Sequence, residues 1–141
     1  HRQQGLSRIE VLIAALILAI GLLGIAAMQA VTLKNSQSAF DRTQAVVLSY
    51  SMFDAMRANA AAARAGGYTL ARTCTVPSAG ATLVSRDQTL WLQSLKDTMG
   101  QSACGTIAAC AANVCSITVE WNDSRATDGD PNETLTTTSR I

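Results

Sequence analysis

The four cysteines are the side chains of this chain best suited to covalent chemistry. They are Cys74, Cys104, Cys110 and Cys115. An even number of cysteines in an exported domain favours two disulfide bonds, for which three pairings are possible. Zinc binding is disfavoured because the spacings are irregular, no C-x-x-C pair is present and the single histidine is His1. A catalytic thiol is disfavoured because no histidine is available as its base.

Glu10 is the one carboxylate that the sequence puts in a demanding environment. It stands directly before a run from Val11 to Met28 in which every residue is aliphatic, glycine or methionine. A run of this length is a candidate bilayer-spanning helix. A charge at the edge of such a segment is costly unless it has a partner. We therefore expect Glu10 to form a contact in self-assembly, the alternative being that it rests in the lipid headgroup layer.

No other residues form a catalytic constellation. The chain lacks a glycine-rich phosphate loop, a Ser–His–Asp set and a pair of carboxylates beside a plausible pocket. The stretch Asp128-Gly129-Asp130 lacks the spacing and the distant glutamate of an EF-hand calcium loop. The sequence therefore predicts no enzymatic activity, no cofactor and no metal site.

Charge is balanced overall and uneven along the chain. The formal net charge of +1 gives no support to nucleic-acid binding. Five of the 10 acidic residues lie between positions 120 and 133, with Arg125 as the only base among them. Two interpretations stay open at this point: a solvated surface, or an acidic edge that meets a basic face on a neighbouring subunit.

The charges around the apolar run predict its orientation. Arg2 and Arg8 precede it, so the N-terminus should stay in the cytoplasm and the remainder should be exported. A cleavable secretory signal is the competing interpretation, because Ala26-Ala27 resembles a small-residue cleavage site. The apolar regions of such signals are usually about 7–15 residues long and lack an acid at their start, so an uncleaved span is favoured.

The helix is expected to continue beyond Met28 with an amphipathic pattern. Leu33, Phe40 and Val47 recur at seven-residue spacing and indicate a helix that lies against something on one face. Further apolar neighbours on the predicted face are Leu48, Met52, Phe53 and Met56. Nothing clearly ends the helix before Gly66-Gly67, where a left-handed cap is expected. The result is one helix of about 60 residues.

Shorter elements are expected after this helix. Residues 68–76 form a strand or an extended loop, and residues 77–82 form a loop. Ser85 and Gln88 have the spacing of a capping box, which predicts a short helix that ends at Gly100. Trp91 is expected in the core or half-buried.

The C-terminal part is expected to supply the sheet. Residues 101–113 are small and rich in cysteine, so they predict a loop held by disulfides. Residues 114–121 alternate as a strand, followed by a long loop over residues 122–132 and a second, antiparallel strand over residues 135–141. One face of the first strand carries Cys115, Ile117, Val119 and Trp121. The predicted fold class is therefore α+β: a long N-terminal α-helix packed on a small antiparallel β-sheet, in one disulfide-bonded domain.

The N-terminal motif resembles the type IV prepilin signature. Gly5-Leu6-Ser7-Arg8-Ile9-Glu10, followed by the apolar helix, carries this resemblance. In that family a prepilin peptidase cuts after the glycine and methylates the new N-terminus, and the acid stands at the fifth mature position. The resemblance implies a cut between Gly5 and Leu6 and an assembly role for Glu10. The expected helix and disulfide-bonded sheet are similar to the type IV pilin fold along most of the chain.

Three further stretches resemble the PilV-like minor pilins. They are Met28-Gln29, residues 48–52 together with residues 56–59, and residues 117–123. This resemblance implies a structural subunit of a tip or priming complex that initiates pilus assembly and links a tip adhesin. The implied partners are other minor pilins and the major pilin, through the N-terminal helix, together with the prepilin peptidase, a tip adhesin and the inner membrane.

The resemblance also implies a division of the chain. Residues 1–5 are a leader remnant, residues 6–30 the transmembrane and assembly half of the helix, and residues 31–141 the periplasmic pilin domain. The expected location is the inner membrane, with a single pass and a periplasmic C-terminal domain, and then the extracellular pilus tip.

Two other functions stay open on the sequence. The first is a minor pseudopilin of a type II secretion system, which shares the layout. The second is a membrane-anchored periplasmic binding or enzyme domain. The second is disfavoured because about 75 residues after Gly66 leave little room for a preformed pocket.

Overall fold

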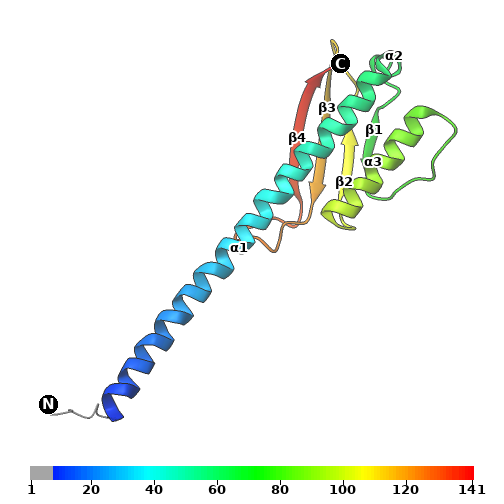
Figure 1. Ribbon diagram of the computed structural model, residues 1–141. Coiled ribbons are helices and arrows are strands. Elements are labelled where there is room, and N and C mark those ends of the chain that lie inside the picture. The colour runs from blue at the N-terminus through cyan, green and yellow to red at the C-terminus, as the bar shows by residue number, and fades with distance from the viewer. Residues whose placement is uncertain (1–7) are drawn as a thin grey trace.

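The computed structural model describes residues 8–141, which form three helices and four strands (Figure 1). The helices are α1 (Arg8–Ala58), α2 (Ala60–Arg64) and α3 (Leu83–Met99). The strands are β1 (Leu70–Thr73), β2 (Cys104–Ile107), β3 (Val114–Trp121) and β4 (Glu133–Arg140). A long helix lies against an antiparallel sheet, so the predicted α+β fold with two disulfides is confirmed.

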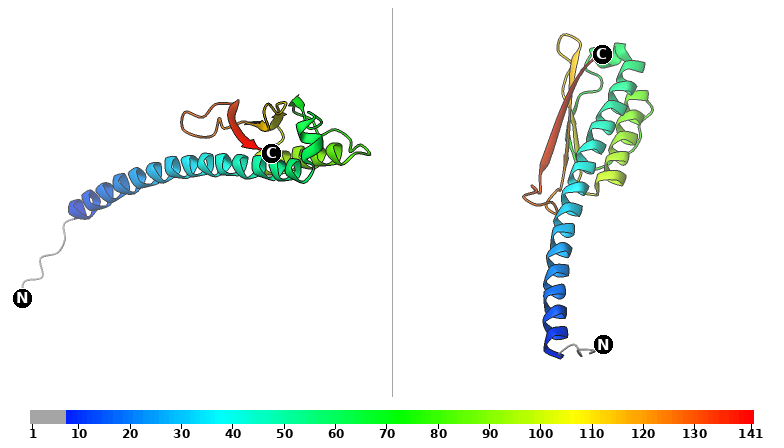
Figure 2. Two further views of the ribbon diagram at one scale, coloured as in Figure 1. Left: turned by 90° about the horizontal axis from the view of Figure 1, so that it is seen from above. Right: turned by 60° about the vertical axis from the view of Figure 1, so that its left-hand side comes forward.

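The sheet is antiparallel throughout, with the strand order β1-β2-β3-β4. The β3–β4 pairing is unbroken from Val114↔Arg140 to Trp121↔Glu133, whereas the β1–β2 register shifts between Leu70 and Thr73. Helices α1 and α3 cover the same face of the sheet (Figures 1 and 2). Strand β4 is one border of the sheet and β1 is the other.

The core lies between this helical layer and the sheet. The alternation predicted for β3 is confirmed, because its four inward residues are buried while the intervening residues are not. Trp91 is buried as expected, and its indole N–H donates to the Leu48 carbonyl at 3.0 Å. The largest fully buried side chains include Trp121, Tyr68, Phe53, Met52, Met56, Leu92, Leu95 and Ile117. Burying each large apolar side chain stabilises the fold by about 1.5–3 kcal/mol.

The expectation of one helix up to Gly66 is wrong, because α1 ends at Ala58 and α2 is separate. Asn59 lies between them with φ −126° and ψ 49°, outside the helical region. Its side chain donates to the Tyr68 hydroxyl at 3.4 Å instead of facing solvent along a continuous helix. Asparagine side chains form such local hydrogen bonds readily, and these bonds compete with the helical conformation of the backbone. The left-handed conformation expected at Gly66 is confirmed, with φ 80°.

The predicted capping box of α3 is also wrong. The N-cap is Thr82, whose hydroxyl accepts a hydrogen bond from the Ser85 backbone N–H at 3.2 Å. The Ser85 hydroxyl instead accepts from the Gly80 N–H at 2.8 Å, and the Gln88 amide donates to the Tyr68 carbonyl at 3.0 Å. Thr82 has an extended backbone and an available hydroxyl, so it caps the helix one turn before the predicted position.

Residues 101–113 do not form only a loop, because they contain β2, a central strand of the sheet. The small side chains of this segment offer little apolar surface to a core, which is why the sequence predicts a loop. The small residues instead allow α3 to pack closely on β2, since a Cβ atom at Gly105 would lie 2.5 Å from the Trp91 ring. Ile107 and Ala103 are buried beside it.

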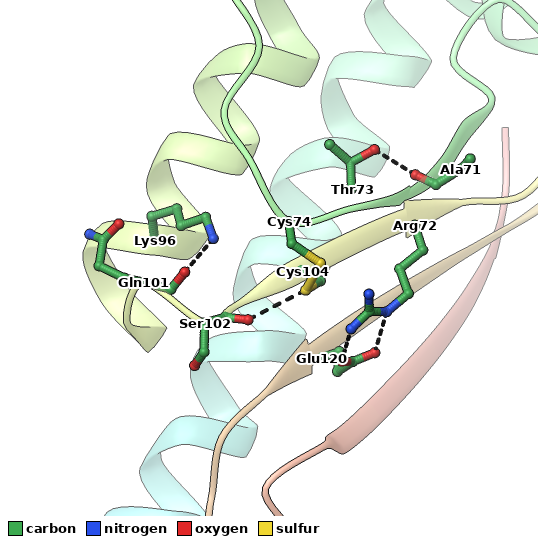
Figure 3. The surroundings of a disulfide bond; sticks show 9 residues. All are labelled: Ala71, Arg72, Thr73, Cys74, Lys96, Gln101, Ser102, Cys104 and Glu120. Carbon is green, nitrogen blue, oxygen red and sulfur yellow. Dashed lines mark hydrogen bonds and ion pairs between the residues drawn. A yellow bond between two sulfur atoms is a disulfide. The ribbon is translucent and has the colours of Figure 1, made fainter.

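The two disulfides are Cys74–Cys104 and Cys110–Cys115. The first joins the chain just after β1 to the start of β2, as Figure 3 shows. The second joins the β2–β3 connection to the start of β3, with a sequence separation of 5. The two bonds expected from the cysteine count are therefore confirmed, and the structure selects one of the three possible pairings.

Candidate assembly surface

The N-terminal half of α1 is exposed along its whole length. Every residue from Arg8 to Gln37 is exposed, and the globular domain begins to cover the helix only near Ser38 (Figure 1). Leu23 and Met28, for example, keep 71% and 73% of their surface. An apolar surface of this extent is not left in water, so lipid or other protein chains must cover it.

Helix α1 is long and apolar enough to cross a membrane. This agrees with the single-pass anchor expected from the sequence. Because none of the apolar segment is buried in the globular domain, the helix is free to enter a bilayer or a helical bundle.

Glu10 lies in the first turn of α1, where a negative charge is favoured by the helix dipole. Its side chain is exposed and makes no ion pair with any residue between 8 and 141. This first turn belongs to the end of α1 that is farthest from the globular domain (Figure 1). The predicted cleavage residues Gly5 and Leu6 lie outside the described residues.

Gly21 and Gly24 have no steric role within the described chain. A Cβ atom at either position would meet nothing within 4 Å. Each glycine costs a helix about 1 kcal/mol relative to alanine. Small residues in an apolar helix allow a second helix to approach closely. These two positions are therefore suited to contact with a neighbouring helix.

The expectation that Leu33, Phe40 and Val47 share one face with the core residues of α1 is wrong. They are 73%, 53% and 54% exposed, whereas Ser49 and Phe53 are fully buried. Residues 40 and 49 differ by nine positions, which at about 100° per residue puts them on opposite sides of a helix. Counting the rotation from Phe40 would have separated the two faces. The exposed stripe formed by Leu33, Phe40 and Val47 extends the apolar surface onto the globular half.

The acidic segment is used largely inside the chain rather than as a free edge. The Asp123 carboxylate accepts from the Ser38 hydroxyl at 2.5 Å, and Glu133 pairs with Arg42 at 2.7 Å. Both contacts tie the 122–132 loop and the start of β4 to α1. The acidic residues that remain exposed in this loop are Asp128 and Asp130.

Glu120 is also paired within the chain. The guanidinium of Arg72 binds both of its carboxylate oxygens, with the Nε–Oε2 distance at 2.9 Å (Figure 3). The hydrogen bond from Arg72 lowers the pKa of Glu120, and the reciprocal contact raises the pKa of Arg72. This pair links β1 to β3 across β2, next to the Cys74–Cys104 bond.

Tyr68 connects the end of the helical segment to α3. Its ring is buried, and its hydroxyl donates to the Asp87 carboxylate at 2.5 Å. Burial, followed by this hydrogen bond, raises the pKa of the Tyr68 hydroxyl. The contact is structural, since the side chain fixes the turn between α2 and β1 against α3.

A cleft of about 650 Å3 lies between α1 and the 122–132 loop. Its walls are Leu33, Lys34, Gln37, Asp41 and residues 123–126. They include the Ser124 hydroxyl, and no hydrogen bond joins it to the carboxylate of Asp41 or Asp123. Across residues 8–141, no three His, Cys, Asp or Glu side chains lie close enough together to hold a metal ion. The best candidate functional feature is therefore the exposed apolar surface of α1, because it requires a covering partner or lipid.

No family model, curated protein or solved structure matches the chain.

Proposed function

We propose that this chain is a minor pilin of a type IV pilus, a structural subunit of a tip or priming complex that initiates assembly and links a tip adhesin. The observation that carries the proposal is Glu10, placed at the start of a helix half that nothing in the globular domain covers. A processing motif precedes it in the sequence. A subunit that packs its helix against other helices needs an uncovered apolar helix half of this kind.

The chemistry of assembly follows from the motif. Prepilin peptidase cuts between Gly5 and Leu6, which frees an α-amine at Leu6 for methylation. When a subunit docks, that amine pairs with the Glu10 carboxylate of a neighbour. Leaving one of the two charges unpaired in an apolar bundle costs several kcal/mol, so the pair sets the register of the subunits.

The remaining exposed features supply the rest of the interface. Gly21 and Gly24 permit close helix contact, and the exposed stripe continues the apolar surface beyond the membrane. Before assembly, residues 6–30 lie in the inner membrane and residues 31–141 lie in the periplasm. The partners of the helix are the other minor pilins and the major pilin.

The first test compares Glu10→Ala with Asp128→Ala, which removes an exposed carboxylate far from the helix N-terminus. Both variants should insert into the membrane and fold like the unmodified chain. Glu10→Ala should be lost from sheared pilus fractions, because the α-amine of its neighbour has no partner, whereas Asp128→Ala should be recovered normally.

Normal recovery of Glu10→Ala in pili would refute the assembly role. The N-terminus of the native chain provides an independent check, since a methylated Leu6 at position one is expected. A chain that is absent from pili, and whose deletion blocks protein secretion, would instead be a type II pseudopilin.

A further inference from the structure

Strand β4 leaves one edge of the sheet open. It is last in the strand order, and β3 is the only strand between residues 8 and 141 that pairs with it. In Figure 1, α1 crosses in front of one face of the sheet and does not continue the sheet beyond β4. An edge strand presents a row of backbone N–H and C=O groups to which another strand can bind.

The hydrogen-bond pattern identifies which groups are free. The Ile141 N–H donates to the Asn113 carbonyl at 2.9 Å, which makes Val114↔Arg140 a pair without mutual backbone bonds. The residues that bond to β3 are therefore those at positions 133, 135, 137 and 139. The backbone groups that point away from the sheet belong to Thr134, Thr136 and Thr138, whose side chains are also exposed.

This edge lacks the devices that usually block strand addition. β4 has eight residues, pairs with β3 without a bulge, and contains no proline or lysine. Its two charged residues, Glu133 and Arg140, are at its ends. Glu133 and the Arg140 carbonyl are engaged by arginines of α1. The opposite border is different, because β1 has four residues and an irregular register. Only β4 offers a long regular edge.

The single helical anchor restricts the partner. Two copies that pair through β4 back to back would be related by a two-fold axis, which would point their α1 helices in opposite directions. Copies in the same membrane, with parallel α1 helices on the same face of the joined sheet, could pair β4 only with β1 of the next copy. β1 is half as long as β4 and could cover only part of it.

We propose that β4 binds the edge strand of a neighbouring, non-identical subunit that is anchored in the same membrane. The partner strand runs antiparallel to β4, spans most of its length, and exchanges backbone hydrogen bonds with Thr134, Thr136 and Thr138. Its exposed face carries β-branched or hydroxyl side chains opposite this threonine row, as in the Thr118–Thr136 pair already present across β3 and β4. This inference rests on the proposed function, because it takes the neighbouring subunit to be another pilin.

Backbone amide exchange tests the pairing directly. The amides of Thr134, Thr136 and Thr138 should exchange at least about tenfold more slowly in native pili than in the detergent-solubilised full-length chain. Amides that already bond to β3, such as that of Leu135, serve as the internal reference. Unchanged exchange of the three threonine amides in pili and in native membranes would overturn the pairing.

A proline variant provides the matched mutational test. Thr136→Pro removes an outward N–H and no bond to β3, and proline is tolerated at edge strands. Thr136→Val removes the same hydroxyl but keeps the N–H. Both should unfold at similar temperatures in detergent, while only Thr136→Pro should fall at least about tenfold in the pilus fraction. Equal recovery of the two folded variants would refute the inference.

The outcomes separate this inference from the proposed function. Protection of the threonine amides in native membranes, with no chain in pili, would keep the strand pairing and refute the pilus role. Protection that appears in the purified chain on raising its concentration would mean pairing between identical copies and would overturn the non-identical partner.

Discussion

The indole N–H of Trp91 donates to the backbone carbonyl of Leu48 at 3.0 Å, and this bond joins α3 to the C-terminal half of α1. The same ring lies over β2 at the position where Gly105 has no side chain. One residue thus holds together the helical layer and the sheet beneath it. The part of α1 that it fixes is continuous with the exposed N-terminal half of the helix.

Replacing Trp91 by phenylalanine should destabilise the fold beyond the loss of ring volume. The hydrogen bond contributes about 0.5–1.5 kcal/mol. Trp121→Phe is the control, because the buried Trp121 Nε1 has no hydrogen-bond partner within residues 8–141. In urea unfolding of the chain in detergent, Trp91→Phe should lose more stability than Trp121→Phe. The reverse order would mean that packing, not the bond to Leu48, fixes α3.

The Arg72–Glu120 pair should make stability sensitive to acid. The pKa of Glu120 is lowered in the folded state, so its contribution is complete above the unfolded value of about 4.5 and is lost as the pH falls through the folded value. Between pH 6 and pH 3 the melting temperature of Glu120→Gln should fall less than that of the unmodified chain. Arg72→Gln should flatten the profile similarly. Parallel profiles for all three proteins would contradict this account.

Tyr68 should act at the opposite end of the pH range. Its folded pKa is raised, chiefly by burial, so its contribution is complete below the unfolded value of about 10 and is lost as the pH rises through the folded value. Tyr68→Phe removes this alkaline loss along with the bond to Asp87. We expect the difference in melting temperature between the two proteins to shrink above pH 10. A constant difference would mean that the hydroxyl does not titrate with unfolding.

The two disulfides should differ in their effect on stability. Cys74–Cys104 closes a separation of 30 residues and Cys110–Cys115 one of 5. The loop-entropy model gives about 3–4 kcal/mol for the first and about 2 kcal/mol for the second. Replacing each pair by alanine and measuring the urea midpoint tests this order. Equal losses would indicate that packing of the sulfur atoms, rather than chain closure, dominates.

Elements with a strong local pattern were predictable from the sequence. β3 alternates without exception, so its bounds and buried face follow from period two, and Gly100 ends α3 because glycine takes a positive φ there. The second strand is expected to begin at Leu135, but β4 begins two residues earlier, at Glu133. The Glu133 side chain is held there by its ion pair with Arg42. The two-disulfide count followed from parity alone.

Elements decided by distant contacts were not predictable in this way. β2 depends on Gly105 meeting Trp91, and the break at Asn59 depends on Tyr68 nearby in the fold. The internal use of Glu120, Asp123 and Glu133 likewise depends on partners at least 48 positions away. For the candidate site, composition identified the apolar helix and Glu10. The exposed face of α1 could not be predicted in this way, because it depends on which residues of α1 the sheet and α3 cover.

The two phenylalanines of α1 separate assembly from folding. Phe40 belongs to the exposed stripe and keeps 53% of its surface, whereas Phe53 is fully buried. Phe40→Ser should change the free energy of unfolding by no more than about 0.5 kcal/mol, as surface substitutions do. Phe53→Ala should cost about 3–5 kcal/mol because it leaves a cavity under α1. If the stripe packs against a neighbouring subunit, folded Phe40→Ser should be depleted from pili in proportion to the apolar contact it loses. Full recovery of Phe40→Ser would confine the assembly surface to the helix before Leu33, so the stripe would be only a solvated face of the globular half.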